Sequence, residues 1–278
     1  MNQIHAPSTP TTLQWFGHSD RGKRSNNEDS FLCLRFDAHE VHRLGKMGEG
    51  SNAATDFAFA VSDGMGGARA GEYASRIAMD KITTLLPRSF QQSAVGLETG
   101  FADVMEELFD QVHKALTYVG GSYEETDGME ATLSLCWFTP GWMFYGHVGD
   151  SRIYSFPASG GIKQLSHDDT HVGWLRRNGQ INEREARTHP RRNVLQKALG
   201  AGNQFVDPQV GAVSYELGDT FLLCSDGLTE GLYDHSMEDF LRSPDFFAAD
   251  VNAAERLVAE AVQRDGRDNT TAVVVRVV

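Results

Sequence analysis

The chain has 278 residues, and 40% of them are apolar, so it can bury a substantial core and a largely disordered protein is excluded. Its 38 acidic and 25 basic residues give a formal net charge of −13, which argues against a non-specific nucleic-acid binder, because such proteins present a basic surface. No apolar run approaches the ~20 residues of a membrane helix, and the first residues lack the basic and then apolar order of a secretory signal.

Three short segments near the start of the chain are rich in aromatic and β-branched residues, which predicts strands. They cover residues 13–18, 30–36 and 57–62. Between the second and the third, the polar stretch 37–56 predicts a long hairpin loop. We expect the beginning of the chain, about residues 1–12, to be flexible.

Two segments with a one-sided apolar stripe follow these strands. In residues 70–86 and 97–119 the apolar side chains recur with the 3.6-residue period of a helix. Because each stripe occupies one face only, each helix is predicted to cover another element rather than to be enclosed.

A second block of strands is predicted at 131–138, 142–148 and 151–156, where breaks that contain glycine indicate an antiparallel meander. The segment 167–199 differs from it, because its polar composition predicts short helices in a surface excursion. The arginines of this segment are Arg176, Arg177, Arg184, Arg187, Arg191 and Arg192.

The last part of the chain returns to regular structure. It is predicted to form a strand at 220–224, helices at 236–241 and 250–263, and a closing strand at 271–278. Strands and then helices, twice over, predict an α+β fold of two antiparallel sheets with helices outside. We find no repeat, linker or low-complexity tract, so residues 1–278 are interpreted as a single domain.

Three cysteines, Cys33, Cys136 and Cys224, lie among apolar residues in predicted strands. A small, odd number fits buried thiols in the reducing cytoplasm, where we expect the protein to reside. The alternative, a catalytic cysteine, is disfavoured because none has the glycine-rich, cationic surroundings that lower the pKa of a thiol.

Three aspartates share one context at the end of an apolar strand. Asp63 and Asp226 each stand in Ser-Asp-Gly after a strand, and Asp268 precedes the closing strand. Taken singly, each is explained by turn chemistry, because Asp-Gly favours hairpin turns. Together they predict a crevice in which the carboxylates repel one another unless a cation neutralises them. Oxygen ligands suit Mg²⁺ or Mn²⁺, and the zinc spacings HExxH and paired CxxC are absent.

The glycines after Asp63 let the backbone approach an ion closely; they are Gly64, Gly66 and Gly67. A nucleotide-binding loop is disfavoured, because this segment contains neither GxxxxGKS/T nor a true GxGxxG.

A basic residue precedes two acidic ones near the start of the chain. Arg24 suits forked contacts with phosphate oxygens. Glu28 and Asp29 follow it closely and are candidates for binding a second cation or its waters. Taken alone, this stretch is better explained as an exposed loop of mixed charge.

Five motifs occur in order between about Ser19 and Val275: RSNNEDSF, AVSDGMGGARAGEYAS, HVGDSRIYSF, LLCSDGL and RDNTTAVVV. Together they resemble the metal-dependent serine/threonine protein phosphatases, the type 2C or PPM family. The resemblance implies a four-layer α-β-β-α sandwich that hydrolyses phosphoserine and phosphothreonine with a water held between two Mn²⁺ or Mg²⁺ ions. Residues 167–199 resemble the flap of bacterial members, whose expected partners are phosphoproteins made by a cognate cytoplasmic Ser/Thr kinase, with no nucleic acid and no membrane.

The family's motifs imply a role for each matching residue of this chain. Asp63 matches the carboxylate that bridges both metals. The Gly64 carbonyl and Glu28 match ligands of one metal, and Asp226 and Asp268 match ligands of the other.

Three further positions follow from the same resemblance. Arg24 matches the arginine that binds the substrate phosphate, and Asp29 and Asp20 match positions that hold metal-bound waters. Bacterial members often bind a third metal; here Asp226 with Asp127 or Glu124 is the candidate set.

Met65 stands where animal members carry a histidine that is a candidate general acid. A methionine cannot protonate a leaving alkoxide, so water at the metals is the expected proton source. His18, His42 and His167 are the alternatives.

Two other functions compete with hydrolysis of phosphoproteins. A non-catalytic phosphate-binding protein on the same fold would have lost Asp63, Asp226 or Asp268, and all three are present. A metal-dependent nuclease would need a basic groove, and no Lys/Arg stripe accompanies the aspartate motifs.

Overall fold

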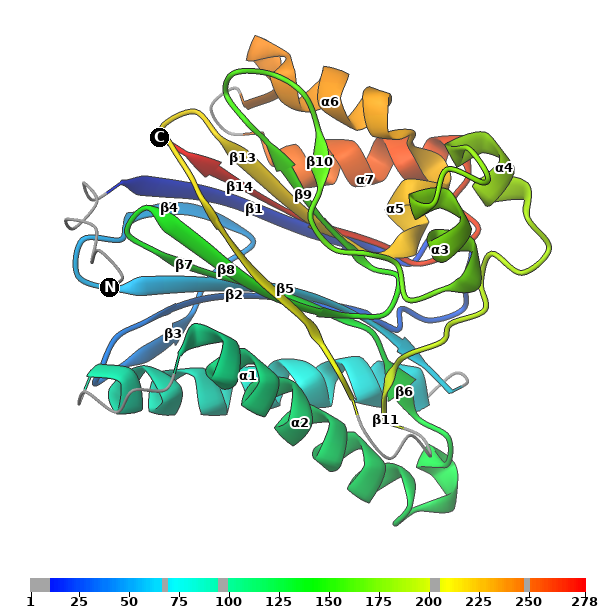
Figure 1. The fold of residues 1–278 in the computed structure, drawn as a ribbon, viewed down its shortest axis with the longest axis horizontal. Coiled ribbons are helices and arrows are strands. Elements are labelled where there is room, and N and C mark those ends of the chain that lie inside the picture. Colours follow the sequence, from blue (N-terminus) through cyan, green and yellow to red (C-terminus); the bar gives the residue numbers. More distant parts are fainter. Residues whose placement is uncertain (1–10, 67–69, 95–99, 201–205, 248–250) are drawn as a thin grey trace.

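Two antiparallel sheets packed face to face form the centre of the protein, and helices cover both outer faces (Figure 1). This computed structural model describes residues 11–66, 70–94, 100–200, 206–247 and 251–278. The arrangement confirms the four-layer α-β-β-α sandwich that the motifs imply.

Each sheet combines strands from distant parts of the chain, and all the strand pairs are antiparallel. One sheet has the order β10 (Lys163–Gln164), β9 (Arg152–Phe156), β13 (Thr220–Cys224), β14 (Thr270–Val277), β1 (Thr12–Asp20), β4 (Met47–Ser51). The other has the order β11 (Leu199–Gly200), β6 (Glu130–Ala131), β5 (Asp56–Met65), β7 (Leu133–Thr139), β8 (Trp142–Val148), β12 (Gln209–Ser214), with β2 (Asp29–Phe36) paired to β5 and β3 (Val41–Arg43) paired to β2.

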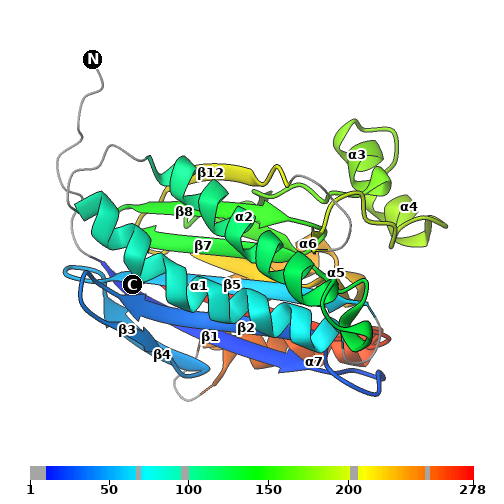
Figure 2. The ribbon, with the colours of Figure 1, turned by 90° about the horizontal axis from the view of Figure 1, so that it is seen from below.

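The helices fall into three groups. The sheet that contains β5 is covered by α1 (Ala70–Ala94) and α2 (Phe101–Gly120), and the sheet that contains β13 is covered by α5 (Asp226–Gly231), α6 (Asp234–Arg242) and α7 (Ala253–Arg264). Two short helices, α3 (His171–Arg177) and α4 (Glu183–Thr188), lie at one end of the sandwich, beside α5 (Figures 1 and 2). Short 3₁₀ turns occur at Glu124–Thr126 and Pro244–Phe247. Within the described ranges, every helix is too short or too polar to cross a membrane.

The alternation of side chains along β5 separates two apolar cores. Phe57, Phe59 and Val61 point into the core between the sheets. Ala58 and Ala60 point the other way, toward α1 and α2, where their small size lets the helices approach. A strand that is covered on both faces is apolar throughout, as the sequence FAFAV shows.

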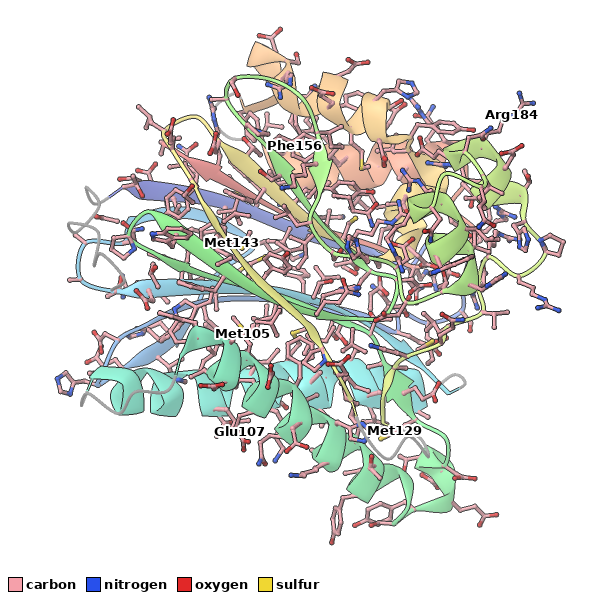
Figure 3. The ribbon with its side chains drawn as sticks, viewed as in Figure 1. Met105, Glu107, Met129, Met143, Phe156 and Arg184 are labelled. Atoms are coloured by element: carbon pink, nitrogen blue, oxygen red, sulfur yellow. The ribbon has the colours of Figure 1, made fainter. Side chains whose placement is uncertain are left out.

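Figure 3 shows the same division in other elements. Met143 of β8 lies between the sheets, whereas Met105 of α2 lies between that helix and the sheet that contains β5. Glu107, two residues later on α2, points to solvent. A third apolar core, which includes Phe156, lies between the other sheet and α5, α6 and α7.

All the predicted strands and helices are confirmed, with shifted ends. The first helix continues through Pro87 to Ala94. Residues 97–99 and 250 of two predicted helices lie outside the described residues, as do residues 1–10 of the expected flexible start, and Thr12 already begins β1. Several short elements were missed, among them β12 and α5, because each of these two has only 6 residues and shows too little of a period to be recognised.

The prediction of a long loop at 37–56 is wrong, because the segment contains β3 and β4. β3 pairs with β2 in one sheet and β4 pairs with β1 in the other, so this segment connects the two sheets. Trp15 Nε1 donates a hydrogen bond to the Gly45 carbonyl at 3.1 Å and fixes its turn. These strands are largely exposed, which explains their polar composition.

Asp56, the first residue of β5, gives a test of this core. Its side chain is buried, and its Oδ2 accepts a hydrogen bond from Trp137 Nε1 at 2.8 Å. Burial raises the pKa of Asp56 from 3.8 to about 6, although that hydrogen bond acts in the opposite direction. Because the pKa is higher in the folded than in the unfolded state, ionised Asp56 destabilises the fold above pH 6, and this penalty disappears as the pH falls toward 4.

We therefore predict that Asp56→Asn, which keeps an oxygen for Trp137, raises the free energy of unfolding at pH 8 by ~1–3 kcal/mol. Urea unfolding of both proteins at a series of pH values measures this difference. The gain should shrink steadily toward pH 4, and a difference that does not depend on pH would contradict the proposed origin.

Candidate active site

A cavity of about 400 Å³ opens at the end of the sandwich where β5 and β13 end and β14 begins. In Figure 1 this end lies on the right, beside α5. The cavity is lined by Arg24, Ser25, Asn26, Glu28, Asp63, Gly64, Met65, Gly66, Asp150, Asn193, Leu195, Asp226, Asp268 and Asn269. The fold therefore brings together six residues that the sequence singled out: Arg24, Glu28, Asp63, Gly64, Asp226 and Asp268.

Strand geometry explains why the carboxylates meet here. Asp63 continues the row of Phe59 and Val61 that faces the other sheet, and Asp29 lies opposite Asp63 in the pairing of β2 with β5. Asp226 directly follows the end of β13 through Ser225. The ends of these strands therefore direct acidic side chains to one point between the sheets.

Crowding of like charges in a buried place changes the acidity of these groups. Burial raises the pKa of Asp63 well above its ordinary value, and the neighbouring Asp29 and Asp226 raise it further. Burial also raises the pKa of Asp226, with Asp150 and then Asp268 as the largest neighbouring contributions. The group as a whole favours either protons or a bound cation.

Two carboxylate oxygens at this end lack a partner. Oδ1 of Asp226 and Oδ1 of Asp29 are buried, and neither accepts a hydrogen bond from any described residue. An unsatisfied buried acceptor is costly, and a cation would satisfy it. Within the described residues no three acidic, histidine or cysteine side chains are yet close enough to share one ion, so the carboxylates would have to turn toward it. In donor type they fit Mn²⁺ or Mg²⁺.

Arg24 forms an ion pair with Asp268, another carboxylate of the cavity. Its Nη2 donates to Asp268 Oδ2 at 2.6 Å, and this contact raises the pKa of Arg24. The side chain of Arg24 is 55% exposed and that of Asp268 is 24% exposed, so the pair lies at the cavity mouth. A cation on Asp268 would compete with Arg24 and free its guanidinium for another anion.

Thr132 and Asn269 fix the backbone of the site. Thr132 Oγ1 accepts a hydrogen bond from the Asp63 amide at 3.0 Å, and the Thr132 amide donates to the Asp63 carbonyl at 2.8 Å. Asn269 Oδ1 accepts from the Glu28 amide at 2.8 Å, and its Nδ2 donates to two carbonyls of the loop 21–26, each at 2.9 Å. Sequence analysis missed both positioning residues, although Asn269 lies next to Asp268 in a quoted motif.

Close backbone packing explains the glycines of this site. A Cβ at Gly64 would lie 1.9 Å from the Gly71 carbonyl oxygen, so the start of α1 lies directly against it. The Gly64 amide donates to the Glu28 carbonyl at 3.2 Å. Gly66 has φ of 123°, in the region that favours glycine. Gly67 lies outside the described residues.

Asp29 and Asp20, which were both expected to hold metal-bound waters, lie in different surroundings. Asp29 is buried behind the cavity wall, where its Oδ2 accepts from Ser225 Oγ at 2.7 Å and burial raises its pKa to about 6. Asp20 does not line the cavity; its Oδ1 accepts from the Gly22 amide at 2.7 Å. In β1, Asp20 shares the alternation of Phe16, which faces the outer helices, and so points away from the core between the sheets.

Asp150 is an acidic wall residue that the sequence analysis did not single out. It lines the cavity beside Asp226, and burial raises its pKa to about 7. Glu124 and Asp127, which were considered as partners of Asp226 for a third cation, are exposed at the turn after α2 and do not line this cavity. The signal for Asp150 was present, because HVGDSR also places an aspartate just after an apolar strand.

No histidine is found among the described residues of the cavity wall, where Met65 is present. His42 is exposed and lies 2.8 Å from Glu40, on the β3 hairpin. His18 and His167 also lie outside the lining. The histidines considered as proton donors are therefore not brought to the site.

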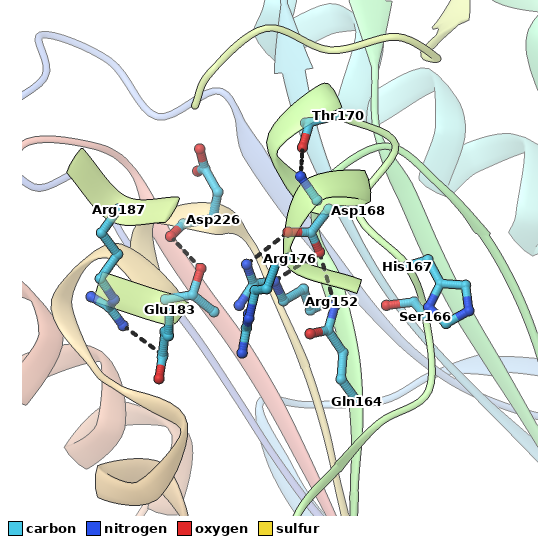
Figure 4. A network of polar contacts seen from close by, with 12 residues as sticks. Arg152, Gln164, Ser166, His167, Asp168, Thr170, Arg176, Glu183, Arg187 and Asp226 are labelled. Atoms are coloured by element: carbon cyan, nitrogen blue, oxygen red, sulfur yellow. Dashed lines mark hydrogen bonds and ion pairs between the residues drawn. The ribbon is translucent and has the colours of Figure 1, made fainter. Parts of the chain in front are cut away.

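The segment 167–199 contains the predicted short helices, α3 and α4, and its base is tied to the sandwich (Figure 4). Thr170 Oγ1 caps α3 by accepting from the Gly173 amide at 2.8 Å. Asp168 accepts a forked pair of hydrogen bonds from Arg152, at 2.8 and 2.7 Å. Asn193 and Leu195 of this segment reach the cavity wall.

Comparison with known proteins places this geometry in a family. The model of the protein phosphatase 2C family matches residues 46–263. The serine/threonine protein phosphatase PstP of Mycobacterium tuberculosis is 31% identical over 270 residues, which are 96% of this chain and 45% of the relative. The chain thus spans less than half the length of PstP. Protein phosphatase PhpP of Streptococcus pneumoniae is 30% identical over 253 residues, 91% of this chain and 92% of the relative.

A solved structure of the PstP catalytic domain in complex with two manganese ions has the same fold. Its TM-score is 0.74 at 28% identity, over 97% of this chain and all of the other.

Repulsion among the crowded carboxylates should lower the thermal stability of the protein without metal. Asp63→Asn should raise the thermal midpoint in EDTA at pH 8, by roughly 2–4 °C for each kcal/mol of repulsion removed. Since the pKa of Asp63 is raised by folding, the gain should shrink as the pH falls and the native carboxyl protonates. Asp207→Asn, at a side chain that is 94% exposed, is the matched control and should show no such gain. A midpoint lowered by Asp63→Asn would contradict this account.

Proposed function

This chain belongs to the protein phosphatase 2C family, and on that premise we propose that it is a metal-dependent enzyme that hydrolyses phosphoserine and phosphothreonine in proteins. The observation that carries the proposal is the convergence of five carboxylates and Arg24 on one cavity, with a buried oxygen of Asp226 that has no partner among the described residues. A cavity of this composition suits cations and, through them, a phosphate dianion.

The acidic residues would hold the metal ions on two sides of Asp63. Glu28 and the Gly64 carbonyl are the proposed ligands on one side, and Asp226 and Asp268 those on the other. Two bound Mn²⁺ or Mg²⁺ ions would lower the pKa of the attacking water and would offset the repulsion between the dianionic phosphate and the hydroxide that this water supplies. The two manganese ions in the PstP structure support this assignment. A further cation on Asp226 would find Asp150 beside it.

Arg24 is the proposed phosphate-binding residue. In the structure its guanidinium is held by Asp268 at the mouth, next to the space that a phosphoryl group would enter. Its planar fork can donate two parallel hydrogen bonds to phosphate oxygens. Such contacts orient the phosphoryl group and strengthen as charge develops in the transition state.

Met65 lines the cavity at the position where a general acid would be needed, and it cannot act as one. Its thioether cannot donate a proton to a leaving alkoxide, and no described residue of the lining is a histidine. The proton must therefore come from water in the cavity. Aryl phosphates leave without such help and should be better substrates than alkyl phosphates.

The partners and location follow as part of the same proposal. The substrates are proteins that a cognate Ser/Thr kinase phosphorylates, and the two enzymes act in the cytoplasm. Support for a reducing compartment comes from Cys33, Cys136 and Cys224, which are all free and buried.

Phosphate release from a phosphothreonine peptide, with Mn²⁺ and with EDTA, tests the proposed function. We predict turnover that needs Mn²⁺ and returns when EDTA is outcompeted. Arg24→Ala should lower kcat/KM by roughly ten- to a thousand-fold without weakening the binding of Mn²⁺. Lys23→Ala is the control, because Lys23 is the neighbouring cation and lies outside the cavity lining.

Three results would contradict the proposal. One is turnover that is unaffected by EDTA. Another is loss of Mn²⁺ binding in Arg24→Ala, which would make Arg24 a member of the metal site. The third is cleavage of single-stranded DNA in a parallel assay in place of phosphate release, which would favour a nuclease.

A further inference from the structure

A second, smaller cavity of about 100 Å³ adjoins the active site. Asp150, Asn193 and Asp226 line both cavities, so the two are continuous. The smaller one lies between the short helices α3 and α4 and the start of α5, in the region drawn in Figure 4. Its volume suffices for several waters or one small anionic group.

Five arginines line this second cavity, and three of them are committed to the fold. Arg152 makes the fork to Asp168 and also donates to Tyr154 Oη at 2.9 Å. Arg176 donates to Asp234 at 2.5 Å.

The third committed arginine is Arg187 of α4. It donates to the Glu230 carbonyl at 2.8 Å and to the Leu232 carbonyl, both at the end of α5, and its guanidinium lies 3.9 Å from the centre of the Tyr233 ring. These contacts hold α4 against the helix that begins with Asp226.

The remaining two arginines, Arg192 and Arg267, are held more loosely. They approach the two oxygens of Glu230 at 3.5 and 3.7 Å, distances beyond those of charge-assisted hydrogen bonds. Arg267 also uses its Nε on Asp265, at 2.8 Å. Within the described residues, the pair with Glu230 is the one ion pair of Arg192. Most of the donors of these two guanidinium groups remain available to a ligand.

The charge of the second cavity depends on the first. Asp168 and Glu183 are paired with Arg152 and Arg187, respectively. Asp150 and Asp226 face the active site, where the proposed metal ions would neutralise them. Among the lining residues, what remains is Glu230 against Arg192 and Arg267, and Asp265, the other partner of Arg267, lies outside the lining.

We propose that this second cavity binds a second anionic group of the same substrate, a phosphate or a carboxylate near the phosphorylated residue, and that Arg192 and Arg267 are the residues that bind it. The inference rests on the proposed function and defines its substrate class as phosphoproteins with clustered negative charge. It also assigns separate roles to the arginines of 167–199, because some hold the segment in place and Arg192 meets the substrate.

Three peptides of one sequence test the proposal: a phosphothreonine peptide with alanine nearby, one with glutamate there, and one with a second phosphothreonine. We expect kcat/KM of the native enzyme to rise from the first to the third by about tenfold or more, which is the size of one charge-assisted contact. Arg192→Gln and Arg267→Gln should each reduce that ratio toward one. The preference should also weaken as salt is added.

Arg184→Gln is the matched control. Arg184 belongs to the same helix as Arg187, does not line the cavity and points outward into solvent (Figure 3). Its substitution should leave all three values unchanged.

The outcomes separate this inference from the proposed function. Hydrolysis of all three peptides at equal rates by the native enzyme would overturn the second site and leave the phosphatase activity standing. A preference that survives in both arginine variants, or one that Arg184→Gln also removes, would overturn the assignment to Arg192 and Arg267. No phosphate release from any peptide or from an aryl phosphate would overturn both proposals.

Discussion

Repulsion among carboxylates held at the end of two packed sheets is the constraint on which the rest of this structure depends. Asp63 and Asp226 both have pKa values raised well above the ordinary range by burial and by their acidic neighbours. The same crowding leaves the buried Oδ1 of Asp226 without a hydrogen-bond partner among the described residues. A fold that keeps such a group together has free energy to gain from binding cations.

The surrounding structure resists that repulsion mainly with contacts of the backbone. Thr132 holds the Asp63 peptide from both sides, and Asn269 ties the loop with Glu28 to the start of β14. Packing against Gly71 leaves Gly64 no room for a side chain. Arg24 is the counter-charge at the mouth, where a metal can replace it on Asp268 and a phosphate can replace Asp268 as its partner.

Local sequence pattern was sufficient to predict the layers and most of the site. The alternation in FAFAVS predicts a strand, and the Ser-Asp-Gly after it predicts that Asp63 lies at its end. The same pattern after β13 gives Asp226. What local pattern could not give is the face of an exposed strand end: Asp20, expected to hold metal-bound waters, does not line the cavity.

Other features depend on contacts between distant segments. Asp150 looks like an ordinary turn residue until β8 and β9 bring it beside Asp226. The segment with β3 and β4 is largely exposed, and its two strands are ordered by pairing with β2 in one sheet and β1 in the other. The arginines of 167–199 are alike in sequence, and only their tertiary partners separate Arg187, which holds α4, from Arg192.

The most direct measurement of the central claim is diffraction from crystals grown with Mn²⁺, with data collected at the manganese absorption edge. The account predicts two anomalous peaks in the large cavity, one on each side of Asp63, the first near Glu28 and the second near Asp226 and Asp268. Saturating Mn²⁺ with no peak beside Asp63, while Arg24 still holds Asp268, would contradict it.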